Sequence, residues 1–198
     1  MRGVFDFIVK PVGSRYENSI EVEGKELILN TKIETFKSVN NIAEVISIPL
    51  AYKTDIKVGD TVIIHHNVFR RFYDIKGKQK NSRAYFKEDL YFCSADQIYL
   101  YKTDTHWKSF GDRCFVKPLK NIDHLKLDKE RKLIGILKYG NDSLKELEIN
   151  PGDLVGYTPF GEYEFIIDNQ RLYCMKSNDI VIKYGYKGDE EEYCGRGT

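Results

Sequence analysis

The sequence predicts an all-β protein made of two copies of one small β-barrel fold, and three observations support this. The 198-residue chain contains 14 Tyr and 11 Phe, residue types that favour half-buried strands. Apolar and polar residues alternate in short runs that end at Gly or Pro. Three sequence blocks also occur in the same order in each half. An ordered internal repeat indicates two copies of one structural unit.

The repeated blocks share apolar residues followed by a turn or a Pro. They pair residues 7–11 with 114–118, 56–62 with 149–155, and 90–98 with 172–180. The first half has the longer loops, because 48 positions separate Pro11 from Gly59 whereas 34 separate Pro118 from Gly152. Loops tolerate changes of length and often carry function, so we expect the specialised features in the first half.

In the first half, alternating apolar residues predict five short strands. These are 4–12, 41–48, 61–65, 90–93 and 98–101. A turn is expected at 57–60, where Gly59 supplies backbone angles that other residues rarely adopt. Residues 69–88 form a long basic connection whose tip we place at 76–81. Residues 94–97 are expected to form a turn or a single helical turn.

The second half repeats the pattern. Its strands are predicted at 114–119, 132–139, 154–157, 162–167, 171–175 and 180–184, with a turn at 150–153. Each set of short strands joined by Gly turns predicts a small closed β-barrel. We therefore divide the chain into a domain at 1–102, a linker at 103–111, a domain at 112–186 and a poorly ordered tail at 187–198.

Composition favours a protein that stays in the cytoplasm. The formal net charge is +1, so no strong overall field attracts the chain to nucleic acid or to a membrane. No apolar run approaches the roughly 20 residues of a membrane span, and the start lacks the pattern of a secretory leader. In that compartment the four cysteines are expected to be free thiols.

The repeated blocks, read as V-K-P, I-x-x-G-D-x-V and L-Y-x-M-x-x-x-D-I-V, resemble the 10-kDa chaperonin family, the co-chaperonins of the GroES type. The resemblance covers about 180 residues, and the second half follows the pattern more closely. It implies two tandem GroES-like, partly open β-barrels that assemble into a homo-oligomeric ring. Such a ring caps an ATP-bound GroEL-type chaperonin around an unfolded client protein. It implies no catalysis and no cofactor of the chain's own.

The family also implies a docking segment between the first two strands. An aliphatic triplet on this segment binds an apolar groove of the chaperonin, and the matching residues here are Leu27, Ile28 and Leu29. The three apolar side chains are flanked by polar residues and have little to pack against locally. A second interpretation is an ordinary hairpin in which Leu27 and Leu29 face the protein's own core.

The sequence departs from the family in two places. The second half has only 121–131 for a docking segment, and Leu125 and Leu127 alternate there with charged residues, as strand residues do. The hairpin that roofs the dome in cellular members has only 51–55 and 141–148 available. The fusion of two copies and the lack of a roof favour the interpretation that the chain is a phage-encoded member of the family, which acts in the host cytoplasm.

The main rival function is single-stranded nucleic-acid binding. Residues 70–87 mix basic and aromatic side chains, as nucleic-acid-binding barrels do, although the balanced overall charge makes this the less favoured partner. A viral structural or accessory protein that retains the barrel is a third possibility. The sequence contains no phosphate-binding or hydrolase motif.

We predict neither a catalytic nor a metal site. Adjacent strand residues point to opposite faces, so His65 and His66 are expected to face core and solvent rather than to share an ion. The charge runs 128–131 and 190–192 are expected to be solvated, since no His or Ser accompanies them in a catalytic pattern.

Overall fold

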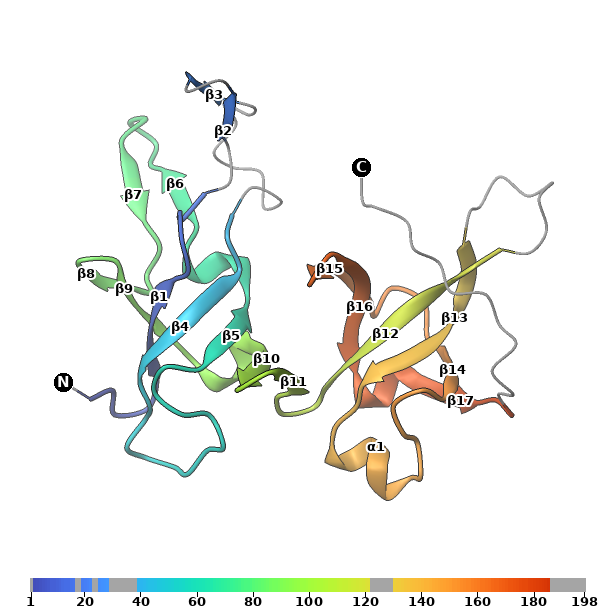
Figure 1. The fold of residues 1–198 in the computed structure, drawn as a ribbon. Coiled ribbons are helices and arrows are strands. Elements are labelled where there is room, and N and C mark those ends of the chain that lie inside the picture. The colour runs from blue at the N-terminus through green and yellow to red at the C-terminus, as the bar shows by residue number, and fades with distance from the viewer. Residues whose placement is uncertain (1, 17–18, 23–24, 29–38, 122–129, 186–198) are drawn as a thin grey trace. The chain divides into compact units, whose positions relative to one another are not determined.

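A computed structural model describes residues 2–16, 19–22, 25–28, 39–121 and 130–185. The chain divides into two compact units, Met1–His106 and Trp107–Thr198 (Figure 1). The division falls inside the predicted linker 103–111, part of which is strand β11 (His106–Ser109). Strands dominate the described residues, which include one α-helix, so the all-β prediction is confirmed.

Unit 1 is built on a seven-stranded sheet in the order β11-β10-β5-β4-β1-β9-β8, whose outer strand β11 begins at the last residue of the unit and continues past the boundary. Its strands are β1 (Phe7–Pro11), β4 (Ile42–Ser47), β5 (Thr61–Ile64), β8 (Tyr85–Lys87), β9 (Leu90–Cys93), β10 (Ile98–Thr103) and β11. Two separate hairpins are β2 (Ser19–Val22) with β3 (Lys25–Ile28), and β6 (Arg71–Tyr73) with β7 (Gln79–Asn81). The predicted tip at 76–81 is therefore wrong in part, because its last three residues form β7.

Unit 2 contains a six-stranded sheet in the order β15-β16-β12-β13-β14-β17 (Figure 1). Its elements are β12 (Arg113–Lys120), β13 (Glu130–Tyr139), α1 (Asp142–Glu146), β14 (Leu154–Tyr157), β15 (Tyr163–Ile167), β16 (Gln170–Lys176) and β17 (Ile180–Lys183). Short 3-10 turns are η2 (His66–Val68) and η3 (Ala95–Gln97) in unit 1, and η4 (Ser177–Asp179) here. The single turn expected at 94–97 is η3.

The two sheets follow the same path. The order from β10 to β8 in unit 1 corresponds, strand for strand, to the order from β17 to β15 in unit 2. The central strands also pair in the same register. Val9 is opposite Val45 and Tyr91 in unit 1, and Val116 is opposite Leu137 and Tyr173 in unit 2. The β1–β4 and β12–β13 pairs even have a register shift at the corresponding residue.

The Gly-Asp turns of the repeat are alike in atomic detail. Gly59 and Gly152 have φ angles of 92° and 99°, a region in which a side chain is strained. The carboxylates of Asp60 and Asp153 each accept a hydrogen bond from the backbone N–H three residues earlier, both at 2.8 Å. These contacts fix the turn before β5 and the turn before β14 in one geometry.

Neither sheet closes on itself through hydrogen bonds between described strands. β8 and β11 are the outer strands of the first sheet, and β15 and β17 are those of the second. The closed barrel expected from the strand pattern is therefore not observed. Both sheets are open, with apolar residues of the repeated blocks at their cores.

Three cysteines lie within these cores as free thiols. Cys93, Cys114 and Cys174 are almost completely buried, and none of them forms a disulfide. Burial raises the pKa of Cys114 and of Cys174 to about 12, so both thiols stay protonated near neutral pH. The free-thiol prediction is confirmed for these three, whereas Cys194 lies outside the described residues.

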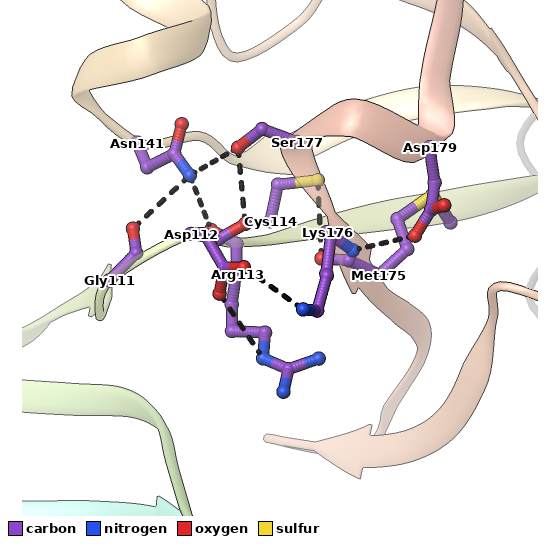
Figure 2. Close-up of polar contacts among 9 residues, drawn as sticks. All are labelled: Gly111, Asp112, Arg113, Cys114, Asn141, Met175, Lys176, Ser177 and Asp179. Atoms are coloured by element: carbon purple, nitrogen blue, oxygen red, sulfur yellow. Dashed lines mark hydrogen bonds and ion pairs between the residues drawn. The ribbon is translucent and has the colours of Figure 1, made fainter. Parts of the chain in front are cut away.

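Asn141 organises the end of unit 2 at which β13 leads into α1. Its Oδ1 accepts a hydrogen bond from the Leu144 N–H at 3.1 Å and so caps the helix. Its Nδ2 donates to the carbonyl oxygens of Gly111 (3.3 Å) and Arg113 (3.1 Å) and to Ser177 Oγ (Figure 2). One side chain thus ties α1, the start of β12 and η4 together.

Helix α1 lies where unit 2 had room for a short roof hairpin. The segment available for it was 141–148, and α1 occupies Asp142–Glu146 within that segment. The matching segment of unit 1, 51–55, contains no strand. Neither position therefore forms a roof hairpin.

Replacing Asn141 by Ala is expected to destabilise unit 2 by about 2–3 kcal/mol, since a helix cap and hydrogen bonds to backbone carbonyls are lost together. The loss of stability is measured as a shift of the urea unfolding midpoint, which is monitored through hydrogen exchange of unit 2 peptides. Asn150→Ala is the matched control, because its exposed amide donates only to the Glu148 carbonyl at 3.2 Å among the described residues. Equal midpoints for the two variants would contradict the role of Asn141.

Candidate docking site

The predicted docking segment begins and ends at one place on unit 1. Tyr16 and Val39 form an antiparallel bridge, and the Asn40 N–H donates to the Arg15 carbonyl at 3.1 Å. The chain therefore leaves the sheet after β1 and returns before β4 through two paired limbs. We call Arg15, Tyr16, Val39 and Asn40 the stem.

A buried amide joins the two limbs of the stem. The Nδ2 of Asn40 donates to the carbonyl oxygens of Val12 (2.7 Å) and Ser14 (2.9 Å). Its Oδ1 accepts from the Ile42 N–H at 2.8 Å. Asn40 is only 6% exposed, so these hydrogen bonds are shielded from water and hold the stem firmly.

The triplet lies partly within the described structure. Leu27 and Ile28 belong to β3, whose backbone pairs with β2, and Leu29 lies outside the described residues. The β2–β3 hairpin forms its own two-stranded sheet and is absent from the strand order of the main sheet. Isolated two-stranded hairpins are marginally stable in water, so a partner can remodel one at low cost. The docking role of the triplet stays a prediction.

Unit 2 has a much shorter connection at the corresponding place. Lys120 at the end of β12 pairs with Glu130 at the start of β13. Leu125 and Leu127, which the sequence assigns to a strand rather than to a docking triplet, lie outside the described residues. Of the two corresponding connections, the one between β1 and β4 in unit 1 is therefore the one long enough for an extended docking segment.

Arg15 connects the stem to the β6–β7 hairpin. Its Nε donates to the Phe69 carbonyl at 2.5 Å, its Nη1 to Asn81 Oδ1 at 2.7 Å and its Nη2 to the Arg70 carbonyl at 3.2 Å. Its guanidinium also lies 5.1 Å from the ring centre of Tyr91. Burial lowers the pKa of Arg15 below its usual value.

Sequence reasoning missed the stem residues Arg15 and Asn40. Their partners lie far away in the sequence, as for Arg15 and Asn81, which are 66 positions apart. A local pattern carries no such information. The only available signal was that Arg15 and Asn40 are polar residues two or three positions from the apolar Val12 and Ile42.

The histidine pair is arranged differently from the prediction. β5 ends at Ile64, and the rings of His65 and His66 stack with centroids 4.4 Å apart instead of facing opposite sides. His65 Nδ1 accepts a hydrogen bond from the Asn67 N–H at 3.1 Å. Among the described residues, no group of three or more His, Cys, Asp or Glu is placed to hold a metal ion.

Acid is expected to weaken unit 1 through His66. Burial, together with the nearby charges of His65 and Arg70, lowers the pKa of His66 from 6.5 to about 4. Between pH 6.5 and 4, His66 therefore binds a proton more readily in the unfolded chain than in the folded chain. The free energy of unfolding falls as the pH falls through this range. His66→Gln should flatten this dependence in urea unfolding across that range, whereas His106→Gln should leave it intact. An unchanged slope in His66→Gln would contradict the assignment.

The predicted charge runs lie mostly outside the described residues. Residues 128–129 and 190–192 are not described by the structure. Glu130 is described, and it accepts a hydrogen bond from the Tyr173 hydroxyl at 2.7 Å and pairs with Arg171 at 3.4 Å. These contacts join β13 to β16, so the role of Glu130 is structural.

Comparison with known proteins gave no family for the chain. Neither a scan against protein-family models nor a search of curated proteins found a match. In the part of the chain that the structure describes, no helix has the length and apolar character of a membrane span.

Proposed function

We propose that this chain is a GroES-like co-chaperonin that caps a GroEL-type chaperonin ring and assists ATP-dependent folding in the closed chamber. The observation that carries the proposal is the common strand order and register of the two units. The three repeated blocks occupy corresponding strands and turns in both, in the order that resembles the co-chaperonin family. The chain itself performs no catalysis in this proposal.

The architecture follows from duplication of one GroES-like, partly open barrel. Two unrelated all-β units would share a strand order by chance more easily than they would share a register shift and a hydrogen-bonded Gly-Asp turn. The bulges at Ile8/Val9 and Phe115/Val116 and the turns at Asp60 and Asp153 supply those shared details. Insertions in unit 1 then distinguish the copies.

The docking mechanism rests on the triplet Leu27, Ile28 and Leu29. Burial of three aliphatic side chains in a chaperonin groove contributes about 4–9 kcal/mol before the cost of ordering the segment. Unit 1 carries the long segment and unit 2 a short one, so each chain offers one contact of moderate strength. Several chains in a homo-oligomeric ring add their contacts, which gives strong but reversible capping.

The cellular setting completes the proposal. A fused, roofless lid fits a phage-encoded co-chaperonin that works in the host cytoplasm and encloses an unfolded client protein. ATP hydrolysis would belong to the chaperonin.

Co-sedimentation with a bacterial GroEL-type chaperonin tests this function. The full chain should migrate alone as an oligomer and should move to the chaperonin fraction with ATP, but not without nucleotide. A monomer that never enters the chaperonin fraction under either condition would refute the proposal and favour an accessory role.

A further inference from the structure

The β6–β7 hairpin is an insertion in unit 1, and its segment is rich in basic and aromatic residues. Residues 70–87 contain seven Lys or Arg and a single acidic residue, whereas the whole chain carries a formal net charge of +1. Four aromatic side chains of this segment are exposed: Phe72, Tyr73, Tyr85 and Phe86. Cationic and aromatic groups that the protein leaves exposed together are typical of an interaction surface.

The hairpin is firmly attached to the stem of the docking segment. Arg15 hydrogen-bonds Asn81 and the Phe69 and Arg70 carbonyls, as described above. Tyr16 Oη accepts from the Arg71 N–H, and the Arg71 guanidinium lies 5.3 Å from the ring centre of Tyr16. Because Arg15 and Tyr16 are also stem residues, these contacts hold the hairpin against the base of the docking segment.

The tip of the hairpin is an ordered turn that displays its apolar and cationic residues. Asp74 Oδ1 accepts hydrogen bonds from the N–H groups of Lys76 and Lys78, both at 2.9 Å, and its carboxylate pairs with Lys80 at 3.3 Å. These contacts lower the pKa of Asp74, the hydrogen bond from Lys78 having the largest effect. The one carboxylate of residues 70–87, that of Asp74, is thus engaged within the turn. The side chain of Ile75 is fully exposed.

The corresponding connection of unit 2 has the opposite character. Between β14 and β16, residues 158–169 contain three acidic residues and no Lys or Arg. Among the described residues, this connection includes no counterpart of the β6–β7 hairpin. The basic hairpin therefore occurs in the unit that also has the long docking segment.

We propose that the β6–β7 hairpin is a second arm, which binds an anionic surface with an apolar pocket on the chaperonin, beside the groove that takes the triplet. This rests on the proposed co-chaperonin function. Lys76 and Lys78 would face acidic side chains, and Ile75 would enter the pocket. The stem holds both arms on unit 1, so binding of one raises the effective concentration of the other.

The tip favours a protein partner over single-stranded nucleic acid. Nucleic-acid grooves combine cations with aromatic rings that stack on bases. A fully exposed aliphatic residue at the tip has no role in such stacking, whereas it suits an apolar pocket on a protein.

Two tip variants test the arm in the full chain: Ile75→Ser, and Lys76→Glu with Lys78→Glu. Both alter exposed side chains, so the fold should persist. Each should weaken binding to an ATP-bound chaperonin by about tenfold or more, measured by biolayer interferometry. The wild-type affinity should fall with added salt, and the charge-reversed variant should show a shallower dependence.

Matched controls lie elsewhere on unit 1. Val58→Ser removes another exposed apolar side chain, and Lys53→Glu with Lys57→Glu makes the same change of charge. Both controls should bind as the wild type does. If the tip variants also bind like the wild type while Ile28→Asp does not, the second arm is refuted and the proposed function stands.

The other outcomes are equally distinct. If the wild type itself fails to bind the chaperonin, the proposed function falls and the arm falls with it. A fluorescent single-stranded oligonucleotide provides the last comparison. If the tip variants lose oligonucleotide binding but keep chaperonin binding, the hairpin is a nucleic-acid site and the proposal is overturned.

Discussion

Ile28→Asp is expected to abolish chaperonin capping and to leave the fold intact. The substitution removes the central aliphatic side chain of the triplet and places a carboxylate where an apolar groove must close around it. We expect the affinity of the ATP-bound chaperonin to fall at least about 100-fold, since the loss recurs at every chain of a ring. Biolayer interferometry measures the affinity, and circular dichroism with urea unfolding checks the fold.

Val58→Asp is the matched control for this prediction. Val58 is an exposed apolar residue of unit 1 in the turn before β5, outside both proposed arms. It should retain full capping. If Ile28→Asp instead caps as well as the wild type, the triplet is not the docking element. If Ile28→Asp unfolds unit 1, the second interpretation of the hairpin, with the triplet packed in its own core, is favoured.

Gly135→Ala is expected to be the most destabilising of the single-residue changes considered in unit 2. A Cβ at Gly135 would lie 2.4 Å from Val116 Cγ1 and 2.5 Å from the Lys117 carbonyl oxygen. The second contact is with backbone, so β12 and β13 must move apart. We expect a loss of about 3 kcal/mol. Hydrogen exchange of unit 2 peptides in urea measures it.

Two comparisons sharpen this result. Gly185→Ala is the control, because a Cβ there meets no atom within 4 Å. Ala43 occupies the corresponding position in unit 1, opposite Pro11 as Gly135 is opposite Pro118. Unit 1 peptides should keep their protection in Gly135→Ala, because the substitution lies in unit 2. A midpoint equal to that of Gly185→Ala would show that the strands tolerate the extra methyl group.

Strand positions were largely predictable from the sequence, because period-two alternation and Gly turns are local signals. The strands predicted at 90–93 and 154–157 have those bounds in the structure. The first strand was predicted to begin at 4, but β1 begins at Phe7. The Val4 carbonyl accepts hydrogen bonds from the N–H groups of Leu50 and Ala51 instead of joining the sheet. Such a contact between distant segments leaves no trace in an alternation pattern.

Features that depend on the contacts of one particular polar side chain could not be predicted from alternation, whether its partners are near or distant in the sequence. Asp74 ends β6 by capping the turn, which moves the tip of the hairpin toward the N-terminus of the predicted range. Asn141 caps α1 where only a short hairpin was considered. Arg15 joins the stem to Asn81. In each case a single polar side chain selects the local structure through partners that the sequence does not identify.

Resemblance to the co-chaperonin family, and not the internal repeat, singled out Leu27, Ile28 and Leu29 as the docking triplet. Their side chains lie outside what the structure describes. What the structure adds is the stem that carries them and the hairpin attached to it. The stem explains how a marginal two-stranded hairpin can be presented from a fixed position on unit 1.

Hydrogen exchange of residues 24–31 in the full chain tests the central claim most directly. The backbone amides of this segment should exchange more slowly once a bacterial chaperonin and ATP are added, and should return to their original rate when the nucleotide is removed. Amides of unit 2 should change little at the equivalent segment. Exchange of 24–31 that stays the same in the presence of ATP-bound chaperonin would contradict docking through the triplet.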